Sequence, residues 1–290
     1  MPQNLRDIRR KIRTVQSIEK ITRAMKMVAV AKLRRLQASV ENGRVYWKQL
    51  DEMIQSVGSQ AGELNHPLLL PNGSDTRAVV VIGGARGLCG SYNVVLLRAA
   101  NEHVKAIDEE LRLVTVGQKA RLFFDRQRRP IHLALTTPDE AHRILQAREI
   151  SRVLQGMYLR GEVGQVDFVY TEFMSAIRQH AKVRQFLPIE PAGPEDGNAN
   201  GHAASAIFEP PAEELLNTLL PRALDSMVYE MLLQSATSEE GARMAAMSAA
   251  TENAAEMKTQ LTQGLNRARQ ALITGEILEI VSGANALMEA

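Results

Sequence analysis

The sequence has few of the residues that usually mark a disulfide-bonded, membrane-spanning or base-stacking protein. Cys89 is the only cysteine among 290 residues, which excludes an internal disulfide and favours a reducing compartment. No run approaches the roughly 18 consecutive apolar residues that a membrane-spanning helix needs. Aromatic residues make up 4% of the chain, and none falls between residues 1 and 45. The basic start of the chain is followed by no apolar segment, so we expect no secretory signal.

Residues that could bind a metal or catalyse a reaction are not arranged for either task. No two histidines stand in an H-x-x-x-H or H-E-x-x-H pattern. The six histidines are His66, His103, His132, His142, His180 and His202. Four acids stand at expected helix starts, where the helix dipole alone explains them. They are Asp139, Glu140, Glu213 and Glu214. We therefore predict no metal, no cofactor and no catalytic residues.

Charge is unevenly distributed along the chain. Residues 1–40 contain 11 Lys or Arg and two acids, a net charge of +9, although the whole chain carries only +2. A basic segment of this kind suits acidic protein, phosphate or lipid headgroups. Because no aromatic residue accompanies it, a nucleic-acid surface is the weaker alternative.

The two ends of the chain show the spacing of long helices. Between residues 1 and 60, apolar residues recur at intervals of three and four, and no proline lies between Pro2 and Pro67. The stripe consists of Leu5, Ile8, Ile12, Val15, Ile18, Ile21, Met25, Val28, Leu36 and Val40. Residues 209–290 repeat the pattern, with Pro221 expected to kink or restart the helix. Their stripe consists of Met227, Met231, Met244, Met247, Met257, Leu261, Leu265, Leu272 and Ile280. Since neither stripe can bury itself, we predict that the terminal helices form an antiparallel coiled coil.

The middle of the chain changes to strands that alternate with helices. "RAVVVIGG", "LRLVTVG", "QVDFVYTEF" and "KVRQFLPIE" read as strands, and helices are expected after the first two and from Pro138. This order predicts a Rossmann-like open α/β domain over residues 75–190, between a helical segment at 1–74 and another at 209–290. Residues 191–208 are rich in Gly, Pro, Asn and Ala and are expected to form a linker.

The segment "GGARGLCGSYN", residues 83–93, lies where a phosphate-binding loop would follow the first strand. It contains neither G-x-G-x-x-G nor the Lys-Ser or Lys-Thr of a P-loop, so a tight structural turn is the favoured interpretation. Cys89 could act there as a nucleophile at a helix start, but a small semi-buried cysteine is the simpler interpretation. From these residues alone, three classes remain open: a scaffold or coupling rotor, an enzyme on the α/β domain, and a coiled-coil organiser of nucleic acid.

Three motifs nevertheless resemble those of one family across essentially the whole chain. They are "IRTVQSIEKITRAMKMVAVAKLRR", "RGLCGSYN" and "ARMAAMSAATENAAEMKTQLTQGLNRARQALITGEILEIVSGANAL". Their order and spacing are similar to those of the gamma subunit of F-type ATP synthase. The resemblance implies a non-catalytic central stalk that turns inside the ring of alpha and beta subunits and couples transmembrane proton or sodium ion flow to ATP synthesis or hydrolysis. It also implies contact with the epsilon subunit and the c-ring, and a peripheral position on the cytoplasmic face of a bacterial inner membrane.

The resemblance also implies roles for individual residues. Contact with the beta subunit is expected from Met25, Arg269, Gln270, Thr274 and Glu276. Contact with epsilon or the c-ring is expected from Lys32, Arg34, Arg35, Arg86, Gly87, Leu88, Cys89 and Gly90.

The chain departs from the family pattern at a few positions. Ala85 stands where an aspartate is usual, and Gly264 and Leu265 replace larger residues. Glycine costs a helix interior about 1 kcal/mol relative to alanine, so Gly264 and Gly275 are expected to soften the last helix. With Cys89 alone, a regulatory pair of cysteines is excluded.

Overall fold

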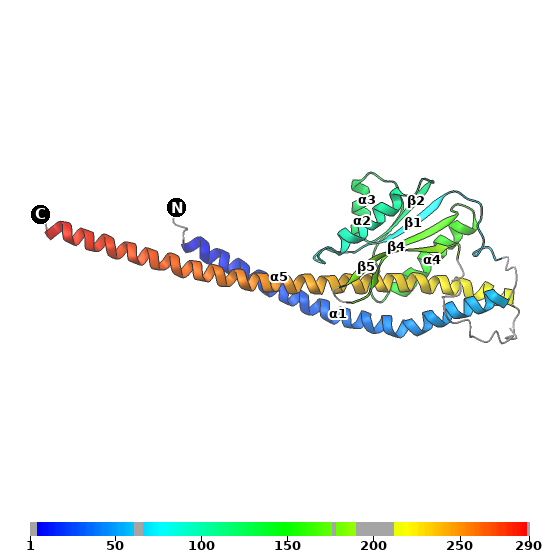
Figure 1. Ribbon diagram of the computed structural model, residues 1–290, viewed down its shortest axis with the longest axis horizontal. Coiled ribbons are helices and arrows are strands. Elements are labelled where there is room, and N and C mark those ends of the chain that lie inside the picture. Colours follow the sequence, from blue (N-terminus) through cyan, green and yellow to red (C-terminus); the bar gives the residue numbers. More distant parts are fainter. Residues whose placement is uncertain (1–4, 61–65, 176–177, 190–211, 289–290) are drawn as a thin grey trace. The chain divides into compact units, whose positions relative to one another are not determined.

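A computed structural model describes residues 5–60, 66–175, 178–189 and 212–288. The chain divides into two compact units. The arm unit comprises Met1–Ala29 with Met244–Ala290, and the sheet unit comprises Val30–Arg243. Helices α1 (Leu5–Gln60) and α5 (Ala212–Met288) each contribute to both (Figure 1). The linker expected at 191–208 lies outside the described residues.

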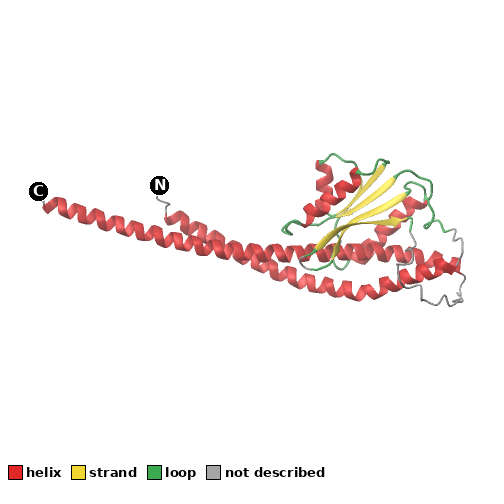
Figure 2. Ribbon diagram, in the orientation of Figure 1, coloured by secondary structure: helices red, strands yellow, loops and turns green. Residues whose placement is uncertain are grey.

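Five strands form one mixed sheet in the sheet unit (Figure 2). They are β1 (Arg77–Ile82), β2 (Leu111–Val116), β3 (Ile131–Leu135), β4 (Gln165–Phe173) and β5 (Gln179–Leu187). The order is β3-β2-β1-β4-β5, and β1 to β4 run parallel while β5 is antiparallel to β4. The predicted open α/β fold is confirmed.

Helices cover both faces of this sheet (Figure 1). One apolar core contains α2 (Tyr92–Lys105) and α3 (Gln118–Arg126), and the other contains α4 (Arg143–Leu159) and part of α5. Because both faces are buried, Ala78 to Ile82 of β1 are all apolar and at most 2% exposed. A sheet with two covered faces gives this kind of continuous apolar run.

Three local expectations need correction. Strand β3 has no counterpart among the predicted strands, because it is a five-residue edge strand whose alternate positions are exposed. Helix α4 begins at Arg143, five residues after Pro138. Asp139 precedes that helix, and its Oδ1 accepts a hydrogen bond from the backbone N–H of His142 at 2.9 Å. Pro221 does not mark a restart, because α5 continues through it. The fully buried Leu220 and Leu224 on either side of the proline help hold the helix there.

The two long helices pair in opposite directions, as predicted. In the sheet unit, Leu36 and Val40 of α1 pack with Leu233 of α5. Beside them lies Trp47, whose indole ring crosses Gly43 so closely that a Cβ at residue 43 would stand 2.6 Å from the ring. In the arm unit, Thr22 faces Thr251, with 2.9 Å between the hydroxyl oxygens, and Lys26 Nζ donates to Ser248 Oγ at 2.9 Å. Residue numbers rise along one helix as they fall along the other, which defines an antiparallel pair.

The buried face of α1 in the arm unit differs from the predicted stripe. Ile18, Ile21 and Val28 are 46%, 59% and 58% exposed. The least exposed positions follow a regular heptad spacing of four and three. They are Ile8, Ile12, Val15, Glu19, Thr22, Lys26 and Ala29. The prediction was wrong here because it followed apolar residues, whereas part of this seam is polar.

Substitution at Gly117 will test how closely the residue after β2 approaches the residue after β1. Gly117 has a φ of +97°, and a Cβ there would overlap the carbonyl oxygen of Gly83. We expect Gly117→Ala to lower the free energy of unfolding by about 2–3 kcal/mol, measured by urea denaturation. Gly73→Ala is the control, because Gly73 has a similar φ of +78° but a Cβ there would meet no atom within 4 Å. Equal losses at the two positions would show that backbone conformation alone, without the contact, sets the requirement.

Candidate functional site

The place where a Rossmann-like sheet usually binds a ligand is filled by α5. In open α/β sheets, ligands lie beyond the carboxyl ends of the strands where the strand order reverses, which here is at β1 and β4. Tyr92 Oη at the start of α2 donates to the backbone oxygen of Ser235 at 3.2 Å. The backbone N–H of Thr171 in β4 donates to Ser235 Oγ at 3.3 Å. The long helix α5 therefore occupies the crevice, and the sheet supports it.

A cluster of buried charged residues lies on α5 next to this crevice. Arg243 is 8% exposed and pairs with Glu239, also 8% exposed, and with Glu240 Oε1 at 2.7 Å. Burial alone would lower the pKa of Arg243, but the charges and hydrogen bonds of Glu239 and Glu240 outweigh it and raise the pKa. Lys32 Nζ on α1 lies 4.0 Å from Glu240 Oε1. Buried charges persist only when they are paired, and the buried pairs here lie within α5, whereas Lys32, which is more than half exposed, adds only a weak contact from α1.

The sequence did not single out this cluster as functional. Its signal is the short segment "SEEGAR", in which three charges at helical spacing interrupt a run of small and apolar residues. Such a segment on an amphipathic helix usually marks an exposed face, and only the tertiary packing shows that it is buried.

The glycine-rich turn is a structural turn, as favoured. The backbone N–H of Gly84 donates to Asn93 Oδ1 at 3.0 Å, and Asn93 Nδ2 lies 3.1 Å from Cys89 Sγ. Cys89 is 2% exposed, and burial, followed by the charge of Glu239, raises the pKa of its thiol. Cys89 therefore faces the interior and positions the turn.

The remaining predicted contact residues of this turn lie outward. Leu88 has a φ of +64° and is 59% exposed, and Arg86 and Gly90 are exposed beside it. Gly87 is partly exposed, and a Cβ at that residue would meet no atom within 4 Å. The turn thus presents a small surface of one guanidinium, one isobutyl group and accessible backbone.

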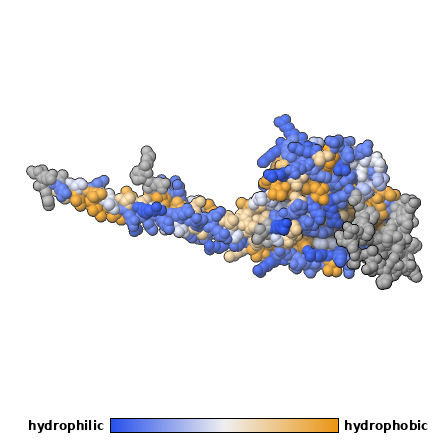
Figure 3. Space-filling view, in the orientation of Figure 1, coloured by the Kyte–Doolittle hydropathy of each residue, from blue (hydrophilic) through white to orange (hydrophobic). Residues whose placement is uncertain are grey.

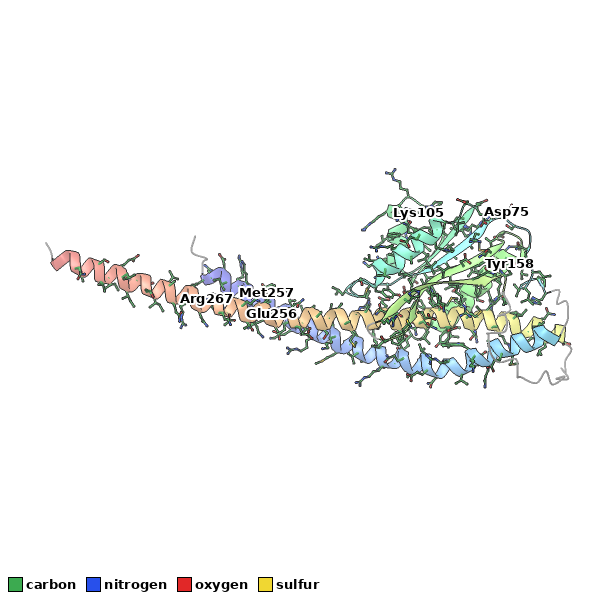
Figure 4. All side chains as sticks on the ribbon, viewed as in Figure 1. Asp75, Lys105, Tyr158, Glu256, Met257 and Arg267 are labelled. Atoms are coloured by element: carbon green, nitrogen blue, oxygen red, sulfur yellow. The ribbon has the colours of Figure 1, made fainter. Side chains whose placement is uncertain are left out.

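The residues predicted to contact the beta subunit lie in the arm unit. Arg269, Gln270, Thr274 and Glu276 are all exposed on α5, whereas Met25 on α1 is half-buried. Glu256, Met257 and Arg267 project from the same part of α5 (Figure 4). Apolar residues also reach the surface there, between hydrophilic ones (Figure 3). The exposed set includes Leu272, Ile273, Ile277, Leu278, Ile280 and Val281.

The predicted basic contacts Lys32, Arg34 and Arg35 belong to the sheet unit. Arg34 and Arg35 are exposed, and Lys32 is more than half exposed although it approaches Glu240. Within the described residues, no three His, Cys, Asp or Glu side chains are placed to hold a metal ion. Among the helices of the described ranges, none contains an apolar stretch of the length needed to span a membrane.

Known proteins match this architecture along its whole length. The family model described as "ATP synthase" matches residues 4–287. The ATP synthase gamma chain of Moorella thermoacetica is 44% identical over 286 residues, covering 98% of this chain and 99% of the relative. The chain belongs to the ATP synthase gamma chain family. The gamma chain of Anaeromyxobacter sp. is 42% identical over 290 residues, with 98% and 99% coverage.

Solved structures show the same fold. A chain from the OSCP/F1/c-ring part of Euglena gracilis mitochondrial ATP synthase aligns with a TM-score of 0.70 and 19% identity, covering 98% of this chain and 94% of its own. A chain from the central stalk and c-ring of the Tetrahymena thermophila mitochondrial enzyme aligns with a TM-score of 0.59 and 24% identity, over 79% and 99%. Gamma chains form the central stalk of F-type ATP synthase, and this chain is such a non-catalytic rotor subunit.

The buried thiol gives a prediction about pH and reactivity. Because the pKa of Cys89 is raised above its ordinary value of 9.0, the native thiol should react slowly with iodoacetamide at pH 8 and faster only at higher pH. Mass spectrometry of the native and unfolded chain will measure both rates. A Val94→Cys variant is the control, since Val94 is 58% exposed and its replacement should label rapidly. Equal native rates at residues 89 and 94 would contradict the buried position.

Loss of the buried Arg243 guanidinium should lower the free energy of unfolding. Arg243→Met leaves the carboxylate of Glu239 without its buried partner, so we expect a loss of about 3–5 kcal/mol in the free energy of unfolding. The matched control is Arg121→Met, which removes an exposed pair with Asp125 at 3.5 Å and should cost under about 1 kcal/mol. Chemical denaturation of the three chains measures both losses. Similar losses in the two variants would show that the Arg243 cluster is not effectively buried.

Proposed function

We propose that the two units of this gamma chain divide the work of the rotor between the catalytic ring and the membrane sector. The arm unit would turn within the ring of alpha and beta subunits, and the sheet unit would bind epsilon and the c-ring. On this proposal, residues 1–74 and 209–290 form the shaft, residues 75–190 form the foot, and residues 191–208 link foot and shaft.

One observation carries the assignment of the arm unit. The C-terminal part of α5 exposes both charge signs together with apolar side chains, and it does so on several sides of one helix. An isolated helix gains nothing from exposing so many apolar groups, and such surfaces usually mark protein contacts. A shaft that turns inside a ring of subunits needs contacts on more than one side. The exposed charged and apolar side chains of α5 can supply them.

The residues that would transmit force follow from exposure and resemblance together. Arg269, Gln270, Thr274 and Glu276 would make polar contacts to the beta subunit, and Met25 would contribute an apolar one. Polar groups on a rigid helix can be satisfied by a succession of partner groups as the shaft turns. Because each orientation of an asymmetric shaft favours a different beta conformation, rotation would bias the three catalytic sites in sequence.

The sheet unit would supply the contacts at the other end of the coupling path. Arg86, Leu88 and the backbone of Gly87 and Gly90 form the exposed part of the turn after β1, which suits a protein contact. Arg34, Arg35 and Lys32 would face polar loops of the c-ring. Cys89 would act indirectly, by holding the turn. The complex would sit on the cytoplasmic face of a bacterial inner membrane and couple proton flow to ATP synthesis or hydrolysis.

Substitutions around Arg267 and Arg269, on nearly opposite sides of α5, will test the assignment of the arm unit. Residues 267 and 269 lie about 200° apart around a helix. We expect Arg269→Ala/Gln270→Ala to reduce ATP-driven proton pumping by roughly tenfold in a complex reconstituted with alpha, beta, epsilon and the membrane sector, since about 1.4 kcal/mol of lost coupling energy gives that factor.

The control is Arg267→Ala, which removes an exposed guanidinium from the side of the helix nearly opposite Arg269 and should retain most of the pumping. Complex assembly is measured in parallel by co-purification of alpha and beta. Unchanged pumping in the 269/270 variant would contradict the residue assignment. Failure of the unmodified chain to co-purify with alpha and beta would contradict the proposed division of work itself.

A further inference from the structure

Asn72 lies in the loop that leads into β1, and its side chain joins this loop to the end of α4. Asn72 Nδ2 donates to the backbone oxygen of Tyr158 at 2.7 Å and to that of Val163 at 2.8 Å (Tyr158 is labelled in Figure 4). The backbone N–H of Ser74 donates to Asn72 Oδ1 at 3.1 Å. Because a backbone carbonyl can only accept and a backbone N–H can only donate, these contacts require an amide at residue 72.

Further contacts hold the same loop, here defined as residues 68–76, in the sheet unit. Tyr158 Oη donates to the backbone oxygen of Leu70 at 2.6 Å, while the ring of Tyr158 is fully buried. Gly164 lies so near the loop that a Cβ there would overlap the carbonyl oxygen of Ser74. The loop therefore packs closely against the turn between α4 and β4.

Asn72 is followed by Gly73, and an Asn-Gly pair is chemically labile. A bond forms between Gly73 N and Asn72 Cγ, the Cγ–Nδ2 bond breaks, and Nδ2 leaves as ammonia with the proton from Gly73 N. Water then opens the resulting succinimide to aspartate or isoaspartate. Glycine favours this attack because it has no side chain to hinder the approach. Among the described residues, none forms a hydrogen bond with the backbone N–H of Gly73, which is exposed.

The native contacts of Asn72 oppose this reaction. When Cγ is attacked it becomes tetrahedral, so Nδ2 and Oδ1 leave the plane in which they now meet three backbone groups. Departure of Nδ2 as ammonia must also break its hydrogen bonds to the carbonyl oxygens of Tyr158 and Val163. The closed loop therefore disfavours the reaction, whereas an open loop leaves the side chain free to react.

The product of the reaction cannot restore the native contacts. A carboxylate has no hydrogen to donate. Aspartate at residue 72 would therefore place a negative charge against the carbonyl oxygens of Tyr158 and Val163, and both carbonyl groups would lose a donor. Isoaspartate would in addition lengthen the backbone of the loop by one carbon atom.

We propose that Asn72 is a site of spontaneous deamidation that is controlled by its own loop. The reaction is slow while the loop is closed, and the loop cannot close in the same way once the reaction has occurred. The modification needs no reactant other than water. It would accumulate with time and loosen the sheet unit where the chain enters β1.

A second Asn-Gly pair in the chain provides an internal control. Asn42 is exposed, and Gly43 follows it within α1, so the same dipeptide is constrained there by the helix and not by this loop. A third pair, at residues 200–201, lies outside the described residues.

Peptide mapping by mass spectrometry measures deamidation at residues 42 and 72 of the full chain, incubated in mildly alkaline buffer with and without urea. In urea the two pairs should react at similar rates. In the native chain, residue 72 should react at least about tenfold more slowly than in urea, because only the open fraction of the loop reacts. Equal rates at residue 72 with and without urea would overturn the proposal.

Tyr158→Phe tests whether opening of the loop controls the reaction. This change removes the hydrogen bond to Leu70 and keeps the buried ring. It should speed deamidation at residue 72 several-fold and leave residue 42 unchanged. An unaltered rate at residue 72 would contradict the proposal. An equal acceleration at residue 42 would also contradict it, since the whole chain would then have to unfold for the reaction.

Asn72→Asp tests the effect of the product. Hydrogen exchange across residues 68–76 should become several-fold faster and the thermal midpoint should fall. The matched change Asn42→Asp, at an exposed position of α1, should affect both much less. Exchange as slow as in the unmodified chain would overturn the proposal. If Asn72→Asp does not fold, the same measurement is made on the deamidated fraction of the unmodified chain, separated by ion exchange.

Discussion

Neither α1 nor α5 can hide its apolar side chains alone, and the antiparallel contact between them is the constraint on which the rest of the chain depends. In the sheet unit this contact is apolar, through Leu36, Val40 and Leu233. In the arm unit it combines buried apolar residues such as Ile8 and Val15 with the polar Glu19, Thr22 and their partners on α5. A single pair of helices is thus held by two kinds of interaction, one non-directional and one that requires a defined geometry.

The sheet gives the helix pair a rigid support. Its crevice at the carboxyl ends of β1 and β4 is where related folds bind nucleotides, but here Ser235 and its neighbours on α5 occupy it. Glu239 of α5, paired with the buried Arg243 on the same helix, lies close to Gly84 after β1. The strand ends therefore hold a helix where other sheets of this kind hold a ligand, which fits a rotor subunit that performs no chemistry.

Much of this could be predicted from the sequence, because the signals were local. The apolar run of β1, the heptad-like spacing of the terminal helices and the three family motifs predicted the fold, the pairing and the family. What could not be predicted depended on tertiary context. The edge strand β3 is too short and too exposed to stand out, and the burial of Arg243 depends on packing across the sheet unit.

The error at Ile18 and Ile21 has the same origin, because apolar spacing does not show which of two adjacent stripes faces a partner. The partner-contact residues remain predictions for a similar reason. Exposure of Arg269 and Gln270 is necessary for such a contact, but the contact is a property of two proteins.

The way Trp47 lies across Gly43 has a practical consequence. It is the only tryptophan in the chain, and it is half-buried beside the apolar contact of Leu36, Val40 and Leu233. The protein therefore carries one tryptophan fluorophore, which lies where α1 and α5 meet in the sheet unit. Its emission wavelength and quenching can follow the opening of that junction in solution, without any label attached to the chain.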